Sequence, residues 1–366
     1  MKILHCADLH LDSKMTANLT PEKARERKAE LLITYQGMVA YAATEGIRHI
    51  LIAGDMFDTK QVTKTTCNVV YRSITEHPEI DFYYLRGNHD ADSFLANMDT
   101  IPDNLHLFQN TWKSYALSDD VFLTGVELDS ANSELIYPSL VLQNDKMNIV
   151  LLHGQESEHG GKKEAETIRL RELRNKGIDY LALGHVHAHQ DGQLDARGTW
   201  CYPGCLEGRG FDECGSHGFV VLDVNEKERT ITHSFVPFAK RELHELMVDI
   251  SDCMTTDDVV LVVEHMLSEK KISEQHMVCF VLVGAVDVEC EYHLELLEKY
   301  FQSRFYFAKW KDKVSRRVDY QAFALDASLK GEFVRTVMAA EDISEEDKAT
   351  IVRYGILGLA GEEISL

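Results

Sequence analysis

Short apolar runs alternate with longer stretches of helical period from Lys2 to about Phe238. The runs are Ile3–Cys6, His49–Ala53, Phe82–Leu85, Val121–Gly125, Asn148–Leu152 and Tyr180–Leu183. Their length and mostly apolar composition are typical of buried strands. The clearest helix is predicted from Pro21 to Thr44, because Gly46 suits the position just after a helix end. A hairpin, Gly218–Val224 with Thr230–Val236, closes this α/β alternation.

A second pattern begins after Pro237. It predicts the strands Leu243–Ile250, His276–Val283 and Arg304–Trp310, with the helices Thr255–Ser268 and Glu291–Phe301 between them. Two further helices are predicted at Ala327–Ala340 and Ser344–Leu359. We therefore expect an α/β (α+β) chain in three parts: residues 1–240, a smaller α/β domain at 241–325, and a helical segment at 326–366.

Composition places the chain among ordinary folded proteins. Of its 366 residues, 45% are hydrophobic and 27% charged. No run approaches the roughly 18 apolar residues of a membrane span, and Ile3–Cys6 is too short for a signal-peptide core, so we expect a cytoplasmic chain with no membrane segment. Its eight cysteines are then expected as reduced thiols. The net charge of −22 disfavours a protein that grips phosphate backbones.

Potential metal ligands occupy five loops, each directly after a predicted strand. In chain order they are Asp8 and His10, Asp55, Asn88 beside His89, His153, and His185 with His187. In an open α/β sheet, ligands bind beyond the carboxyl ends of the strands, so these loops should converge on one site. Glycines precede Asp55, Asn88 and His185, where they allow tight turns or close approach of the backbone.

Carboxylate, amide and imidazole groups together suit divalent Mn, Fe or Zn. Seven such side chains, with water, are enough for two ions, and two ions about 3.5–4 Å apart can hold the attacking and leaving oxygens of phosphoester hydrolysis. Each piece alone is weak, since an isolated histidine is more often structural. The ordered set, and Gly87-Asn88-His89-Asp90 above all, is difficult to explain by packing and favours the metal site.

These motifs resemble, in order, the five motifs of the calcineurin-like metallophosphoesterase superfamily. Within it the chain resembles the SbcD family of bacterial DNA-repair exonucleases, close to its YhaO-like branch. That finer resemblance rests on His5–Asp12, Gly54–Asp58, Tyr202–Gly204, Leu206–Phe211 and Ser328–Arg335. It implies a metallophosphoesterase (nuclease) β-sandwich flanked by helices, a cap domain that guides DNA to the metals, and C-terminal helices.

The resemblance also implies roles for individual residues. Asp8, His10 and His187 would hold one metal, most simply Mn, although Fe, Zn or Mg also fit; Asn88, His153 and His185 would hold the other, with Asp55 bridging the two. His89 would be catalytic, facing the substrate to stabilise charge or protonate the leaving oxygen. Asp58 would complete the catalytic pair by orienting His89, and Asp90 is expected to support the loop rather than act as an acid.

Candidate DNA contacts are basic residues outside the metal cluster. Arg209 lies in a loop that the resemblance places near the metals, and Lys309–Arg317 combines Trp310 with the cations Lys309, Lys311, Lys313, Arg316 and Arg317. This segment is open to two interpretations, a phosphate and base contact or a solvated hairpin turn. The basic residues of the first helix, Lys23, Arg25, Arg27 and Lys28, alternate with glutamates and are expected to form a solvated face.

The resulting hypothesis is an SbcD-like, Mn-dependent DNA exonuclease/endonuclease of DNA repair. The resemblance further implies an SbcC-like coiled-coil ATPase as partner, and a homodimer is also expected. Its rivals are a small-molecule phosphodiesterase or nucleotidase with the same metals, and a non-catalytic scaffold for the ATPase. Two bound ions would reverse the local field at the site, so the charge of −22 predicts weak DNA affinity without metal rather than no nucleic acid.

Overall fold

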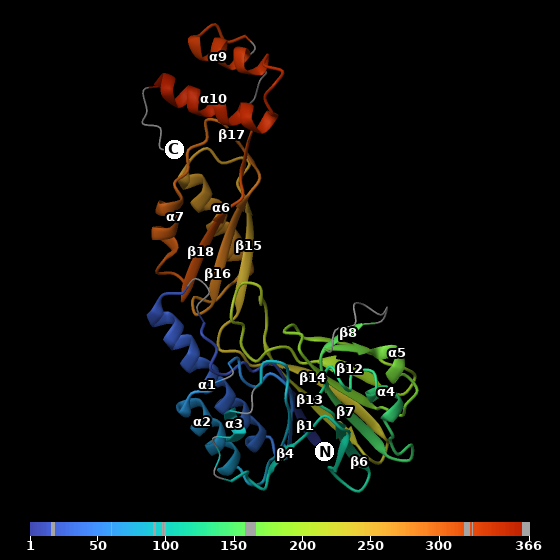
Figure 1. Cartoon of the computed structure of the whole chain (residues 1–366). Helices are drawn as coiled ribbons and strands as arrows, with labels where there is room; N and C mark the ends of the chain where they lie inside the picture. The colour runs from blue at the N-terminus through green and yellow to red at the C-terminus, as the bar shows by residue number, and fades with distance from the viewer. Residues whose placement is uncertain are drawn as a thin grey trace. The chain divides into compact units, whose positions relative to one another are not determined.

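The computed structural model describes residues 1–15, 19–59, 61–90, 93–96, 98, 100–157, 166–317, 323 and 325–360. The chain divides into two compact units, Met1–Glu242 and Leu243–Leu366 (Figure 1). Each unit has its own hydrophobic core. The finer division of the second unit at residue 325 stays a prediction.

The first sheet of unit 1 has the strand order β14-β13-β1-β2-β3-β4. Strands β1 to β4 run parallel, while β13 and β14 join as an antiparallel hairpin beside β1. Their bounds are Lys2–Cys6 (β1), His49–Ala53 (β2), Asp81–Leu85 (β3), Leu105–Leu107 (β4), Gly218–Asn225 (β13) and Thr230–Pro237 (β14). The last four residues of β1, β2 and β3 are all buried, which is why these strands appear in the sequence as apolar runs.

The second sheet has the order β11-β12-β10-β7-β6-β5, with a parallel centre and antiparallel edges. Its strands are Lys113–Ala116 (β5), Val121–Gly125 (β6), Met147–His153 (β7), Tyr180–Gly184 (β10), Gln190–Gln193 (β11) and Thr199–Tyr202 (β12). A short parallel pair, Gln155–Ser157 (β8) and Thr167–Arg169 (β9), follows the central strand β7.

The two sheets pack face to face with helices on both outer sides (Figure 1). Apolar residues of both inner faces, such as Leu51 and Ile149, form the core between the sheets. Helices α1 (Pro21–Thr44), α2 (Lys64–Thr75) and α3 (Ser93–Ala96) lie beside the first sheet, and α4 (Ile136–Ser139) and α5 (Leu170–Leu173) beside the second. The predicted fold class, a helix-flanked β-sandwich, is confirmed.

Helix α1 has the expected ends. The Thr20 side chain accepts the Lys23 N–H at 3.3 Å, Pro21 stands at the start, and Gly46 adopts φ 67° just past the end. The expected solvated basic face is wrong at Arg27, which is only 1% exposed. Its guanidinium donates to Glu30 at 2.6 Å and to Glu207 at 3.0 Å. Glu207 is 180 residues away in the sequence, so the pattern of the helix does not reveal it as a partner.

Glu30 is the centre of this buried network. Burial disfavours its charge, but hydrogen bonds from Arg241, Arg27 and Lys240 outweigh that cost and lower the pKa of Glu30 from 4.5 to about 2. The ionised side chain therefore stabilises the fold fully above about pH 4.5, and this contribution is lost as the pH falls toward 2. A pKa difference of this size corresponds to roughly 3 kcal/mol.

We expect Glu30→Gln to lower the free energy of unfolding by about 2–3 kcal/mol at pH 7, as measured by urea denaturation. The difference from wild type should shrink as the pH is lowered from 4.5, because the wild-type carboxylate then loses its charge too. Glu45→Gln is the matched control, since Glu45 pairs with Lys2 on the surface and should cost less than about 1 kcal/mol. A difference that stays constant from pH 7 to pH 3 would contradict the assignment.

Unit 2 begins with a three-stranded parallel sheet, β15-β16-β18, built from Leu243–Asp249, Met277–Val283 and Phe307–Asp312. Helices α6 (Thr256–Lys270) and α7 (Leu294–Phe301) pack on one face of it. Short strands β17 (Ala285–Asp287) and β19 (Ser315–Arg317) pair in parallel, and α9 (Leu329–Met338) packs with α10 (Glu345–Ala360). The predicted order of the three main strands and the four helices is confirmed, but the short strands β17 and β19 are absent from the predicted pattern.

Trp310 lies on the helix-covered face of this sheet. It is 6% exposed and stacks on Phe280 with ring centroids 4.4 Å apart. Alternation along β18 turns Lys309 and Lys311 to the opposite face. Trp310 is therefore core, and it is not available to stack on an exposed base as one interpretation of Lys309–Arg317 expects.

Among the described residues, no helix is both long and apolar enough to cross a membrane.

Candidate metal centre

Loops from both sheets meet at the carboxyl ends of their parallel strands. β1, β2 and β3 supply the loops with Asp8, Asp55 and Asn88, and β7 and β10 supply those of the second sheet. The Asp8 N–H donates to the Gly54 carbonyl at 3.0 Å, and the His185 N–H donates to the Asp8 carboxylate at 3.0 Å. The seven predicted ligands are thus gathered at one edge of the sandwich, as strand polarity requires.

Asp8, His10 and His187 form the first half of the centre. Their ligand atoms lie within 4.8 Å of one another. The Nε2 atoms of His10 and His187 are 3.1 Å apart, and Asp8 and His10 are both buried. Two imidazole nitrogens and a carboxylate that converge in this way match the donor set of one transition-metal ion.

Asn88 and His153 form the second half, with Asp55 between the halves. Asn88 Oδ1 lies 3.0 Å from His153 Nε2. Asp55 Oδ2 lies 3.5 Å from that same nitrogen and 3.9 Å from His10 Nε2, the position of a carboxylate that can bridge two ions. The His185 ring lies edge-on to that of His153, with centroids 5.3 Å apart. Donor chemistry and placement therefore fit two divalent cations.

The Asp55–His153 pair is electrostatically coupled. Burial opposes both charges, but the hydrogen bond to Asp55 and the negative charges of Asp8 and Asp55 together outweigh this cost and raise the pKa of His153 to about 9. In the same way, His153 holds the pKa of Asp55 well below its usual value despite burial. Because a metal ligand must be deprotonated, a cation that binds here displaces the His153 proton.

The backbone of this centre is strained where the ligands are presented. Four of the seven ligands, Asp8, His10, Asp55 and His185, have φ values between 42° and 103°, a region that non-glycine residues seldom adopt. Gly87 passes so close to Asp55 that an added Cβ would lie 2.2 Å from its Oδ1. Strain of this kind persists where the surrounding structure enforces it, as at functional sites.

His89 and Asp90 occupy opposite sides of their loop. His89 is exposed, its main-chain N–H donates to Asp55 Oδ1 at 2.9 Å, and its ring lies 5.3 Å from that of His10. Asp90 points inward and accepts main-chain N–H groups from Gly87, Phe57 and Met56. Burial raises the pKa of Asp90 to about 6 against the effect of these donors. The structure places Asp90 as loop support and leaves His89 open to a substrate.

Asp58 and Arg209 contact each other beside the centre. Asp58 Oδ1 lies 3.1 Å from His10 Nδ1 and accepts Arg209 Nη1–H at 2.9 Å. The orientation of His89 by Asp58 stays a prediction, since the Asp58 carboxylate lies within 4.8 Å of a His89 ring nitrogen but makes its shorter contacts with His10 and Arg209. The Arg209 guanidinium is 19% exposed and bound to carboxylates, so a substrate phosphate would have to compete with them.

Glu213 belongs to the centre although the sequence pattern does not indicate it. The His187 Nδ1–H donates to its carboxylate at 2.7 Å, and Arg209 donates to it as well. Glu213 lies 26 residues after His187 in an irregular loop, and no strand end precedes it. The sequence signal that could indicate Glu213 is its position two residues after Leu206–Phe211, a segment that carries the family resemblance.

The predicted basic segment of unit 2 divides into paired and exposed residues. Lys311 donates to Glu245 at 2.6 Å, and Arg316 donates to the Cys290 carbonyl at 2.8 Å. Lys309 is half-buried, whereas Lys313 and Arg317 are exposed. Lys313 and Arg317 are thus the members of the predicted set whose surroundings best suit a phosphate contact.

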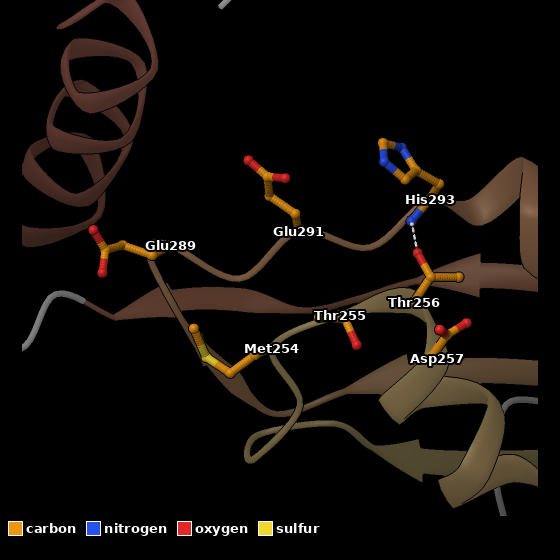
Figure 2. A pocket seen from close by; sticks show the side chains of 7 residues that line it. All are labelled: Met254, Thr255, Thr256, Asp257, Glu289, Glu291 and His293. Carbon is orange, nitrogen blue, oxygen red and sulfur yellow. Dashed lines mark hydrogen bonds between the residues drawn. The ribbon is translucent and has the colours of Figure 1, made fainter. Parts of the chain in front are cut away.

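Unit 2 also has an open hollow of about 480 Å³ at the start of α6 (Figure 2). Its polar groups serve the fold. The Thr255 side chain and Asp258 cap α6 reciprocally, and the His293 N–H donates to Thr256 Oγ1 at 3.0 Å. The hollow is lined by Met254, Thr255, Thr256, Asp257, Glu289, Glu291 and His293. The contacts of Thr255, Thr256 and His293 thus stabilise the start of α6, and the functional assignment rests on the metal centre.

Comparison with known proteins gives matches along the chain. Residues 1–189 match the model of the calcineurin-like phosphoesterase family. The metallophosphoesterase YhaO of Bacillus subtilis is 24% identical over 74% of this chain and 68% of its own length. The DNA double-strand break repair protein Mre11 of Saccharolobus solfataricus is 20% identical over 100% of this chain and 96% of its own. A dimetal phosphatase from Danio rerio shows 10% identity and a TM-score of 0.38, covering 61% of this chain and 92% of its own.

Proposed function

Because the chain belongs to the calcineurin-like phosphoesterase family, we propose that this metal-dependent phosphoesterase cleaves DNA as an SbcD-like exonuclease/endonuclease. The observation that carries the proposal is the convergence of Asp8, His10, Asp55, Asn88, His153, His185 and His187 at one sandwich edge, with His89 exposed beside them. The relative named for DNA double-strand break repair, Mre11 of Saccharolobus solfataricus, supports the nucleic-acid substrate.

The protein side chains divide the chemical work. Two divalent cations, for which we propose Mn, would lower the pKa of the attacking water and neutralise phosphate charge. Asp55 holds the two halves of the centre together through its position between His10 and His153. His89, exposed next to His10, is placed to donate a proton to the leaving oxygen or to stabilise the charge that develops.

The proposal also covers DNA contacts in unit 2, protein partners and the location of the protein. Lys313 and Arg317 would contact the phosphate backbone, and the weak affinity expected from a net charge of −22 would confine DNA binding to the metals and such local groups. An SbcC-like coiled-coil ATPase and a second copy of the chain are the proposed protein partners, and the proposed location is the cytoplasm.

The test is a digestion assay with Mn, Mg or Zn on linear duplex DNA, single-stranded DNA and a panel of nucleotides. We expect Mn-dependent cutting of DNA that Asn88→Ala reduces at least about tenfold. Asn225→Ala is the control, because the exposed Asn225 ends β13 beside the start of β1, whereas the metal ligands follow the opposite end of β1. Hydrolysis of nucleotides without cutting of DNA would instead support a small-molecule phosphodiesterase. The net charge of −22 is also compatible with that function.

A further inference from the structure

Two carboxylates stand behind the two histidines of one half of the metal centre. Glu213 Oε1 accepts His187 Nδ1–H at 2.7 Å, and Asp58 Oδ1 lies 3.1 Å from His10 Nδ1. Arg209 Nη2 also lies 3.2 Å from His187 Nδ1, but the shorter contact is to the carboxylate, which can only accept. With a proton on each Nδ1, the two Nε2 atoms are unprotonated and can bind a metal ion. These Nε2 atoms lie 3.1 Å apart.

Arg209 joins these two carboxylates. Its Nη1–H donates to Asp58 Oδ1 at 2.9 Å and its Nη2–H donates to Glu213 Oε1 at 2.9 Å. The main-chain N–H of Arg209 adds a further bond, to Glu213 Oε2 at 2.7 Å. We call Asp58, Arg209 and Glu213 the carboxylate clamp. A guanidinium in this position neutralises the two acids and fixes their orientation through its planar fork.

Glu213 is itself held rigidly. The Cys205 thiol lies 3.8 Å from its carboxylate, and His217 Nε2–H donates to its main-chain carbonyl at 2.9 Å. Cys205 and His217 are both buried and lie 3.2 Å apart, Sγ to Nδ1. The Arg209 guanidinium forms an ion pair with the same carboxyl group at 2.9 Å. The acceptor that faces His187 is therefore an ordered carboxylate.

The other half of the centre is built differently. His153 Nδ1–H donates to the main-chain carbonyl of Ala53 at 2.8 Å, so a neutral group orients that ring. A carboxylate partner raises the basicity of a ligand imidazole more than a carbonyl does, and loss of such a partner typically weakens metal binding 10–100-fold. The two halves should thus respond differently to changes in the clamp.

We propose that the carboxylate clamp positions His10 and His187 as Nε2 ligands and sets the affinity of the Asp8–His10–His187 half for its cation. This inference deepens the proposed function and rests on its two-metal centre. Asp58, Arg209 and Glu213 are positioning residues, which act through the histidines. Arg209 accordingly serves the metal centre first and a substrate phosphate only secondarily.

The test is a titration of chelator-treated protein with Mn, followed by calorimetry. For the wild type we expect two sites per chain. Glu213→Gln and Arg209→Lys should each weaken one site 10–100-fold and leave the other within about threefold. Glu213→Asp, which keeps the charge, should recover part of the lost affinity. Arg197→Lys is the matched control, because Arg197 pairs with Asp179 just before β10, away from the metal end of that strand.

Two results would overturn the clamp. Unchanged affinity at both sites in Glu213→Gln would show that the carboxylate does not act on the metal. Equal weakening of both sites together with a lowered Tm would show a general structural role. A wild type that binds fewer than two ions would instead overturn the two-metal centre itself, and that failure is visible before any variant is examined.

Discussion

Asp55→Asn is expected to lower kcat/KM for Mn-dependent phosphodiester hydrolysis at least about a thousandfold. Asp55 lies between His153 and His10, and its second oxygen accepts the His89 N–H. Asparagine keeps the shape and tolerates the φ of 51° at this position, but it removes the bridging charge. Loss of several kcal/mol of transition-state stabilisation by the cations corresponds to this factor.

The measurement uses bis(4-nitrophenyl) phosphate as substrate, with metal content and Tm recorded for the same samples. Asp12→Asn is the matched control, since Asp12 is also a buried aspartate with positive φ and bonds Thr63 outside the ligand set. We expect the control to retain activity within a few fold. An Asp55→Asn protein within tenfold of wild type would refute the bridging role.

His89→Ala is expected to reduce kcat about 10²–10⁴-fold while two metal ions stay bound. His89 is exposed and lies beside His10, so its removal takes away a proton donor without taking away a ligand. The loss should be large for a dinucleotide, whose leaving alkoxide needs a proton. It should be smaller for a 4-nitrophenyl ester, whose leaving group departs readily without one.

The comparison of these two substrates separates the possible roles of His89. Equal loss on both would indicate charge stabilisation rather than proton donation. Loss of one metal ion along with activity would make His89 a ligand and would contradict its assignment as a catalytic residue. His106→Ala is a useful control because His106 is a partly buried histidine that bonds Asp81, at the amino-terminal end of β3.

Much of the sandwich can be predicted because its central strands are buried on both faces. β1, β2, β3, β7 and β10 all appear as apolar runs for that reason, and the metal ligands lie at or just after the end of each. The edge strands β5 and β11 have no such pattern, since Lys113–Ala116 and Gln190–Gln193 are largely exposed and polar. Edge strands are paired by neighbours rather than specified by their own hydrophobicity.

Side-chain partners distant in sequence are the part that local patterns do not predict. Arg27 appears as one of several helical cations, yet it is buried against Glu207 from another part of unit 1. Trp310 and Lys309 are neighbours in sequence but lie on opposite faces of a sheet, and helices α6 and α7 cover the face that holds Trp310. Glu213 acquires its role solely from the fold that brings it to His187.

The strand-end cluster is expected to bind two divalent cations and to use both to hydrolyse phosphodiesters. The most direct measurement is the rate of bis(4-nitrophenyl) phosphate hydrolysis by chelator-treated protein as Mn is added back. The arrangement of the seven ligands around Asp55 predicts that the rate rises from near zero and saturates at two Mn per chain. Saturation at one Mn per chain, or hydrolysis that does not depend on added metal, would contradict it.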